Sequence, residues 1–137
     1  MLVELAVSQR SRLERTGGGV HLITEWRECR GPWLMLESGH HIRGACLAAS
    51  RSASLRIVGD SFHELDTAGV AGIVFLADAH IGIRTWPASR GVTLDVWVCG
   101  GRDDDHARAW SVIESLRNVY RPSSEELLQV GRGDPGR

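Results

Sequence analysis

The sequence contains no lysine, because all 16 of its basic residues are arginine. Chemistry that needs a Schiff-base lysine or any catalytic lysine is therefore excluded. Cysteine is also scarce, and the three that occur form no CxxC or CxxH pair, so neither a disulfide framework nor a zinc site is predicted. The net charge is only −1 and the arginines are scattered. This balance argues against nucleic acid or an anionic membrane as partner.

Long hydrophobic runs are missing too. No apolar stretch approaches the length that spans a membrane, and the N-terminus lacks the apolar core of a secretory signal peptide. We therefore expect a cytoplasmic protein with no membrane contact. The 137 residues, with 42% hydrophobic and 24% charged side chains, suffice for one domain with a modest core.

The pattern along the chain predicts an α+β domain. β-Branched runs bounded by Gly, Pro, Asp and Ser predict strands over residues 20–26, 54–58, 69–76, 80–85 and 92–99. One helix is expected over residues 33–50, after Pro32, and a second is expected after the acidic run 103–105. A further short element is expected over residues 125–130. This order gives a two-layer sandwich whose helices leave one sheet face to be buried, which favours a dimer.

We divide the chain into three parts. Residues 1–18 form an N-terminal helix or arm that ends at the glycine run 17–19, residues 19–130 form the folded domain, and residues 131–137 form a disordered tail.

Three blocks of sequence carry a family resemblance. They are residues 21–29 (HLITEWREC), the Phe62-His63 pair followed by residues 69–72 (GVAG), and residues 78–100, which include Trp86-Pro87. In order and spacing they resemble the small prokaryotic S-adenosylmethionine decarboxylases. The resemblance covers roughly residues 19–120 and implies that family's α+β protomer, with an antiparallel sheet and helices on one face. It also implies a homodimer with pocket residues from both copies.

The resemblance assigns a cofactor that this sequence cannot form. In the family a serine attacks the preceding carbonyl, the chain is cleaved, and a pyruvoyl group remains as the electron sink for decarboxylation. The corresponding residue here is Ala79, which has no oxygen. We therefore expect an uncleaved chain without pyruvoyl, and no other cofactor.

Other family positions have changed as well. Arg84 replaces the processing histidine, and a guanidinium stays protonated and cannot act as a neutral base. Ala71 replaces a second processing serine, Ala88 replaces a ribose-binding glutamate, and Leu65 replaces the aromatic that stacks on adenine. These changes together indicate natural divergence, with loss of both processing and nucleoside recognition.

Several polar residues remain at family positions. Cys99 takes the place of the catalytic proton donor. The candidate catalytic residues are Cys99, His80, Asp95 and His63, and the candidate substrate-binding residues are Asp78, Ala79, Glu25, Leu65 and Trp86. Each has a plainer interpretation: a buried thiol for Cys99, hydrogen-bonded histidines at the sheet edge, a solvent-facing or turn-capping Asp95, and a core or dimer contact for Trp86.

No metal site is predicted. His40 and His41 are the tempting pair, but adjacent residues on a helix point in different directions.

Three functions are compatible with the resemblance. The first is a repurposed small-molecule enzyme that uses the inherited pocket for an amino-acid or S-adenosylmethionine-related ligand. The second is a non-catalytic regulatory partner, or a ligand-binding pseudoenzyme, of a polyamine-type decarboxylase. The third, residual decarboxylation with another electron sink, ranks last because no lysine is present.

Overall fold

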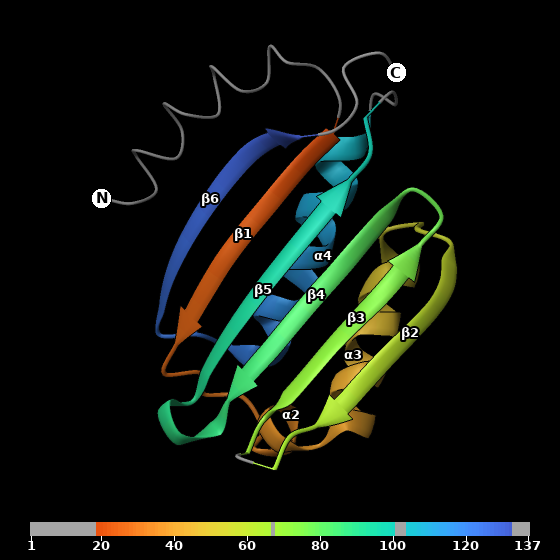
Figure 1. Cartoon of the computed structure of the whole chain (residues 1–137). Helices are drawn as coiled ribbons and strands as arrows, with labels where there is room; N and C mark the ends of the chain where they lie inside the picture. The colour runs from red at the N-terminus through yellow and green to blue at the C-terminus, as the bar shows by residue number, and fades with distance from the viewer. Residues whose placement is uncertain (1–18, 67, 101–103, 133–137) are drawn as a thin grey trace.

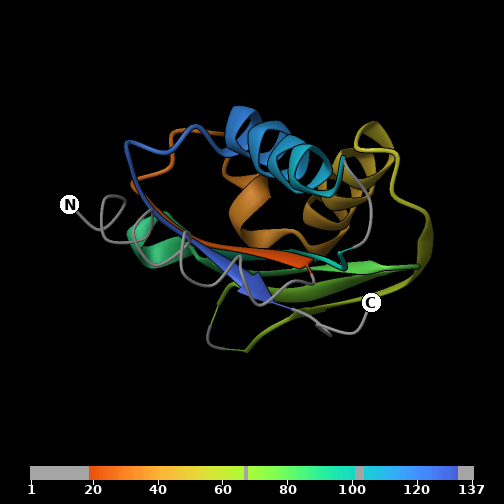
Figure 2. The same ribbon diagram turned by 90° about the horizontal axis from the view of Figure 1, so that it is seen from above.

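The structure, a computed structural model, describes residues 19–66, 68–100 and 104–132. It contains one six-stranded antiparallel sheet in the order β2-β3-β4-β5-β1-β6 (Figure 1). The helices all lie on one face of this sheet (Figure 2). The predicted α+β sandwich is thus confirmed. The elements are β1 (Gly19–Arg27), α2 (Leu34–Glu37), α3 (Gly39–Ser52), β2 (Ile57–Glu64), β3 (Val70–Leu76), β4 (Ala79–Trp86), a 3-10 turn (Pro87–Ser89), β5 (Gly91–Val98), α4 (Asp105–Tyr120) and β6 (Ser124–Arg132).

Most predicted elements correspond to observed ones, with two differences of extent. The expected helix 33–50 is divided at Ser38, whose hydroxyl accepts a hydrogen bond from the His41 N–H and so caps α3. The strand expected over 54–58 was placed too early. Residues 53–54 form a turn after α3, with Ser54 at φ +60°, and the extended strand begins at Ile57.

The described residues can be compared with the predicted N-terminal arm and C-terminal tail. The arm proposed for residues 1–18 lies outside the described residues, as does the tail from 133 onward. β6 continues to Arg132 and pairs with β1 along its whole length, so it includes the first two residues of the predicted tail.

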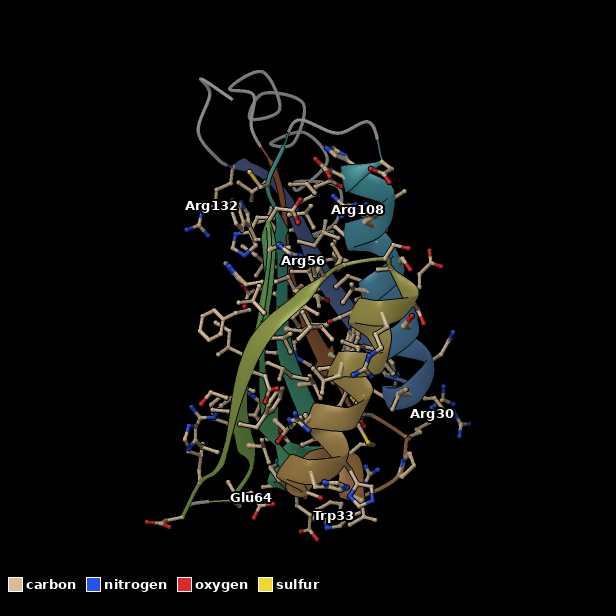
Figure 3. The ribbon with its side chains drawn as sticks, turned by 90° about the vertical axis from the view of Figure 1, so that its right-hand side faces the viewer. Arg30, Trp33, Arg56, Glu64, Arg108 and Arg132 are labelled. Carbon is tan, nitrogen blue, oxygen red and sulfur yellow. The ribbon has the colours of Figure 1, made fainter. Side chains whose placement is uncertain are left out.

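The core lies between the sheet and the helices (Figure 3). Alternate residues of each strand point towards it, as the two-residue period of a strand requires. Leu22 and Val96 from the sheet meet Ile42 of α3 and Ile113 of α4, and none of the four is more than 1% exposed. In Figure 3, Arg108 stands beside α4 on this side of the sheet, whereas Arg132 stands on the other.

The connection between β2 and β3 depends on a glycine. Gly69 has φ +96°, and a Cβ there would lie 2.3 Å from the carbonyl oxygen of Thr85. The buried Thr85 side chain joins three segments, since its hydroxyl accepts from the Val70 N–H and donates to the Leu36 carbonyl. These contacts tie the end of β4 to α2 and to the start of β3.

The opposite surface of the sheet, which we call the open face, carries none of the helices formed by the described residues (Figure 2). It presents polar groups together with three exposed apolar side chains, Ile23, Phe75 and Trp86. Among the described residues, no helix combines the length and the apolar character needed to cross a bilayer.

Candidate functional site

The register of the sheet arranges the open face in rows. One row runs Phe75, His80, Trp97, His21, from β3 through β4 and β5 to β1. The next runs Ile73, Gly82, Asp95, Ile23, and a third runs His63, Ala71, Arg84, Thr93, Glu25 across five strands. Residues from distant parts of the chain therefore become neighbours on one flat surface.

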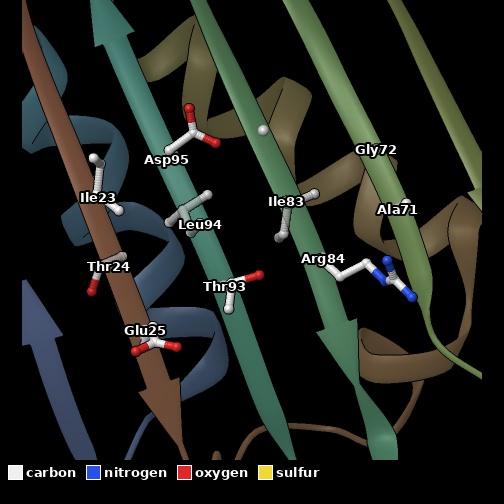
Figure 4. A pocket seen from close by; sticks show the side chains of 11 residues that line it. Ile23, Thr24, Glu25, Ala71, Gly72, Ile83, Arg84, Thr93, Leu94 and Asp95 are labelled. Atoms are coloured by element: carbon white, nitrogen blue, oxygen red, sulfur yellow. The ribbon is translucent and has the colours of Figure 1, made fainter.

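A central depression of about 490 Å³ lies over the second and third rows (Figure 4). Glu25, Arg84 and Asp95 bound it on three sides, and the aliphatic side chain of Ile23 and the hydroxyl of Thr93 also line it. Two small residues, Ala71 and Gly82, leave the space open at β3 and β4. The depression thus offers one cation and two carboxylates over a partly apolar floor.

Arg84 carries a side-chain N–H donor in this depression that lacks a hydrogen-bond acceptor within the described part of the chain. Its Nε is buried and has no hydrogen-bond partner among the described residues. Its guanidinium carbon lies 4.5 Å from the ring centroid of Trp86, which is a cation–π distance. A buried unpaired N–H costs about 1–3 kcal/mol. A ligand oxygen would remove that cost once the guanidinium turns its Nε towards the depression.

Asp95 forms a cluster with two histidines at one end of the depression. Its Oδ2 lies 2.9 Å from Nε2 of His21 and 3.4 Å from Nε2 of His80. Partial burial opposes ionisation of Asp95, but its hydrogen bonds and electrostatic interactions with His21 and His80 outweigh this effect. The pKa of the carboxyl therefore lies below its ordinary value. We refer to this group as the His21–Asp95–His80 cluster.

Three other predicted residues lie farther along the sheet. His63 is exposed on the edge strand β2, where Nε2 is 2.7 Å from the Ser61 hydroxyl, and Ala71 separates it from Arg84 in the row. Leu65 is half-buried in the β2–β3 connection, where its N–H donates to the Gly69 carbonyl. Trp86 is 44% exposed and reaches the site only through Arg84.

Cys99, Asp78 and Ala79 meet at the other end of β4. The Cys99 N–H donates to the Asp78 carbonyl at 2.8 Å, and the Asp78 carboxylate lies 3.7 Å from Arg108. Ala79 is 6% exposed and points into the core. Cys99 is free and also 6% exposed, and it does not line the central depression. The structure therefore joins His80, Asp95 and Glu25 in one site and leaves Cys99 apart from them.

The other two thiols are structural. Burial raises the pKa of Cys29 to about 11 and that of Cys46 to about 12, so both are protonated at neutral pH.

Two residues of the site were not predicted. His21 was seen only as part of a sequence block, and Arg84 was counted as a lost histidine. The signal for His21 is its spacing from Glu25: four residues on a strand place both side chains on one face. Arg84 lies two residues from Trp86 and four from His80, so the same rule applies to it.

Comparison with known proteins identifies the family. The model of the S-adenosylmethionine decarboxylase family matches residues 20–133. The chain belongs to this family. The S-adenosylmethionine decarboxylase proenzyme of Thermomicrobium roseum is 33% identical over 115 residues, which cover 84% of this chain and 93% of that protein. The proenzyme of Methanococcus aeolicus is 28% identical over 123 residues, with 84% and 93% coverage.

A solved structure supports the fold of the family member. The adenosylmethionine decarboxylase of Aquifex aeolicus superposes with a TM-score of 0.74 and is 23% identical, covering 84% of this chain and 90% of that one. At this identity the likeness establishes the fold alone. Family membership and fold are therefore settled, and the chemistry must be argued from the residues present.

Proposed function

We propose that this family member is a repurposed small-molecule enzyme that stays uncleaved and binds its ligand on the open face. The residues do not fit a pyruvoyl group: position 79 carries a buried methyl group, with no oxygen from which a ketone could derive. No step is therefore routed through that cofactor. The His21–Asp95–His80 cluster is the polar group that lies beside a ligand in the depression.

The observation that carries the proposal is the unpartnered Nε of Arg84 in the central depression. A guanidinium binds a carboxylate with paired N–H donors, so a carboxylate is the group that Arg84 would hold. Glu25 stands on the far side, two strands away in the same row. Two strand spacings amount to about 10 Å between backbones, which suits a ligand whose charges are several bonds apart.

These charges describe an amino acid with a cationic side chain. Its carboxylate would pair with Arg84 and its distal cation with Glu25. The exposed Arg27 now lies 3.5 Å from one Glu25 oxygen. An exposed pair of this kind is worth at most about 1 kcal/mol, so a ligand cation can replace it. S-adenosylmethionine is less well suited, because Leu65 and Ala88 lack the aromatic ring and the carboxylate attributed to these family positions.

Thermal shift with L-arginine and L-ornithine tests this assignment. Both should raise the melting temperature, and at 100 times the Kd the stabilisation is about 2.7 kcal/mol. Agmatine and putrescine, which lack the carboxylate, should give no shift. Arg84→Gln should abolish the shift. Arg43→Gln, which removes an exposed arginine paired with Asp60, should leave it unchanged. Equal shifts for the amino acids and the amines, or for both variants, would contradict the proposal.

We propose further that a second copy of the chain covers the open face. Ile23, Phe75 and Trp86 are 39%, 48% and 44% exposed there, and the face carries charges of both signs, so it can be self-complementary. In such a homodimer the depression would be closed from above. The same surface is what a non-catalytic partner of an active decarboxylase would use, and this is the second candidate function.

Light scattering coupled to size exclusion separates these candidates. The homodimer predicts twice the chain mass of 15.0 kDa. Phe75→Glu would place an unpaired charge in the interface, so the dimer should dissociate and the observed mass should halve. Leu34→Glu, at an equally exposed apolar position in α2, serves as the control and should leave the mass unchanged. A monomer that pairs only when an active paralogue is added would favour the regulatory function.

A further inference from the structure

The His21–Asp95–His80 cluster has the geometry of a set of metal ligands. One nitrogen from each ring and one carboxylate oxygen all lie within 4.8 Å of one another. The residues come from three adjacent strands, β1, β4 and β5, and each is half-buried. They are distant in the chain, with His21 and Asp95 separated by 74 residues. No short sequence motif therefore contains all three residues. The expectation of no metal site was based on sequence spacing alone, which cannot detect such a cluster.

The register explains why the three side chains converge. His80 and His21 occupy one row on either side of Trp97, and Asp95 lies in the next row on the middle strand. The carboxylate therefore reaches between the two imidazoles. Gly82 lies opposite Asp95, and a Cβ at Gly82 would be 2.5 Å from Asp95 Oδ1. The absence of a side chain at position 82 is thus what lets the carboxylate adopt this position.

The two separations from the Asp95 carboxylate oxygen to the histidine nitrogens match those between ligands on a single ion. With bonds of about 2.0–2.1 Å, two ligands lie about 2.9 Å apart at a right angle and about 3.4 Å apart at a tetrahedral angle. Asp95 Oδ2 lies 2.9 Å from His21 Nε2 and 3.4 Å from His80 Nε2. We propose that these three residues bind one divalent first-row transition-metal ion, with Zn²⁺ as the representative case.

The chemistry of the donors sets the class of metal. Two imidazoles and one carboxylate suit zinc, iron, cobalt or nickel, whereas Mg²⁺ and Ca²⁺ prefer oxygen ligands throughout. Three protein ligands leave further coordination positions, and since Asp95 also lines the central depression, the ion would lie at its edge. The site depends on the cluster alone, and it stands whether or not Arg84 binds an amino acid.

The surrounding residues orient one ligand and restrain the other. His80 stacks on Trp97 at 5.5 Å between centroids, and the Trp97 indole N–H donates to the Arg132 carbonyl. Arg132 Nη1 also donates to Nδ1 of His21 at 3.1 Å. A guanidinium can only donate, so this contact puts the His21 proton on Nε2, which then donates to Asp95. A metal on Nε2 needs that proton on Nδ1, so Arg132 must turn away when the ion binds.

Arg132 therefore competes with the metal, which gives the proposal a specific signature. In Arg132→Gln the amide oxygen can accept from Nδ1–H, and the affinity for the metal should rise. A side chain that merely supported the fold would not act in this direction. Changes to a residue that hydrogen-bonds to a metal ligand commonly alter metal affinity by about 10–100-fold, and an increase towards that range is expected.

The experiment uses the full chain without a polyhistidine tag, stripped with a chelator and titrated with Co²⁺ and Zn²⁺. Cobalt absorption and calorimetry should report one ion per chain, and Mg²⁺ should not compete. His21→Ala and His80→Ala should each weaken binding by at least about tenfold. Asp95→Asn keeps the shape of the carboxylate and tests the charge. His63→Ala is the matched control, because it removes an imidazole from the same face outside the cluster.

The titrations can give results that support the metal site or results that overturn it. Absence of stoichiometric binding, or equal affinity in His80→Ala and in the unmodified chain, would overturn the proposal. If an alanine variant loses its circular dichroism spectrum, Asp95→Asn and Arg132→Gln supply the test. Opposite changes in affinity for these two would support the site, and unchanged affinity in both would overturn it.

Discussion

A purified sample of this chain is expected to consist of one intact polypeptide with no cleavage between Asp78 and Ala79. Ala79 begins β4, pairs with Leu76 and Val98, and carries a methyl group where self-cleavage would need a nucleophilic oxygen. Because no group at that position can form the ester, the effect is all or none. Intact-mass spectrometry after prolonged incubation at neutral pH measures it directly, and two fragments divided at that bond would contradict the proposal that the chain stays uncleaved.

The variant Ala79→Ser shows whether the hydroxyl alone is missing. We expect it to remain intact, because Ala71 and Arg84, at the other two positions that the family resemblance assigns to processing, supply no hydroxyl and no neutral base. Rapid cleavage of this single variant would show that those positions are dispensable. The proposal that the unmodified chain stays intact would not be affected.

The second large effect concerns stability. Trp26→Ala is expected to lower the free energy of unfolding by about 3–5 kcal/mol, the range for deleting a large buried aromatic. Trp26 is 1% exposed, packs on Tyr120 with 5.8 Å between ring centroids, and donates its indole N–H to Glu125. The Glu125 carboxylate is also paired with Arg117 of α4, so the substitution loosens the contact between β1, β6 and α4 together.

Urea unfolding followed by far-ultraviolet circular dichroism measures this loss at one fixed protein concentration. Trp33→Ala is the matched control, since Trp33 is 45% exposed and contacts the Arg90 guanidinium at 5.4 Å. Its removal should cost about 1 kcal/mol or less. Equal losses for the two variants would mean that the packing around Trp26 contributes little.

Much of the fold could be predicted because its strands have local signatures. The alternation in β1 and the β-branched runs in β3, β4 and β5 follow from burying one face of a sheet, and the observed bounds differ from the expected ones by only one or two residues. β2 was misplaced because its sequence, IVGDSFHE, mixes polar and apolar residues on an edge strand. Its position depends on pairing with β3, which no local pattern records.

The site was predicted only in part, for a related reason. Asp95, His80 and Glu25 were recognised from the family resemblance, and the structure places all three on the open face. His21 and the positive role of Arg84 depend on the order of the strands, which places β1 next to β5 and β5 next to β4. Cys99 was favoured by its family position, but the structure places it at a buried strand end away from the depression.

The position of β1 has a consequence for how the site assembles. β2 to β5 follow one another as hairpins, whereas β1 must insert between β5 and the last strand, β6. That insertion joins segments at opposite ends of the chain, and such long-range pairing forms slowly. β1 supplies both His21 and Glu25, so undocking of this one strand dismantles both ends of the depression while the meander stays paired. The proposed ligand and metal sites therefore both require that β1 is paired between β5 and β6.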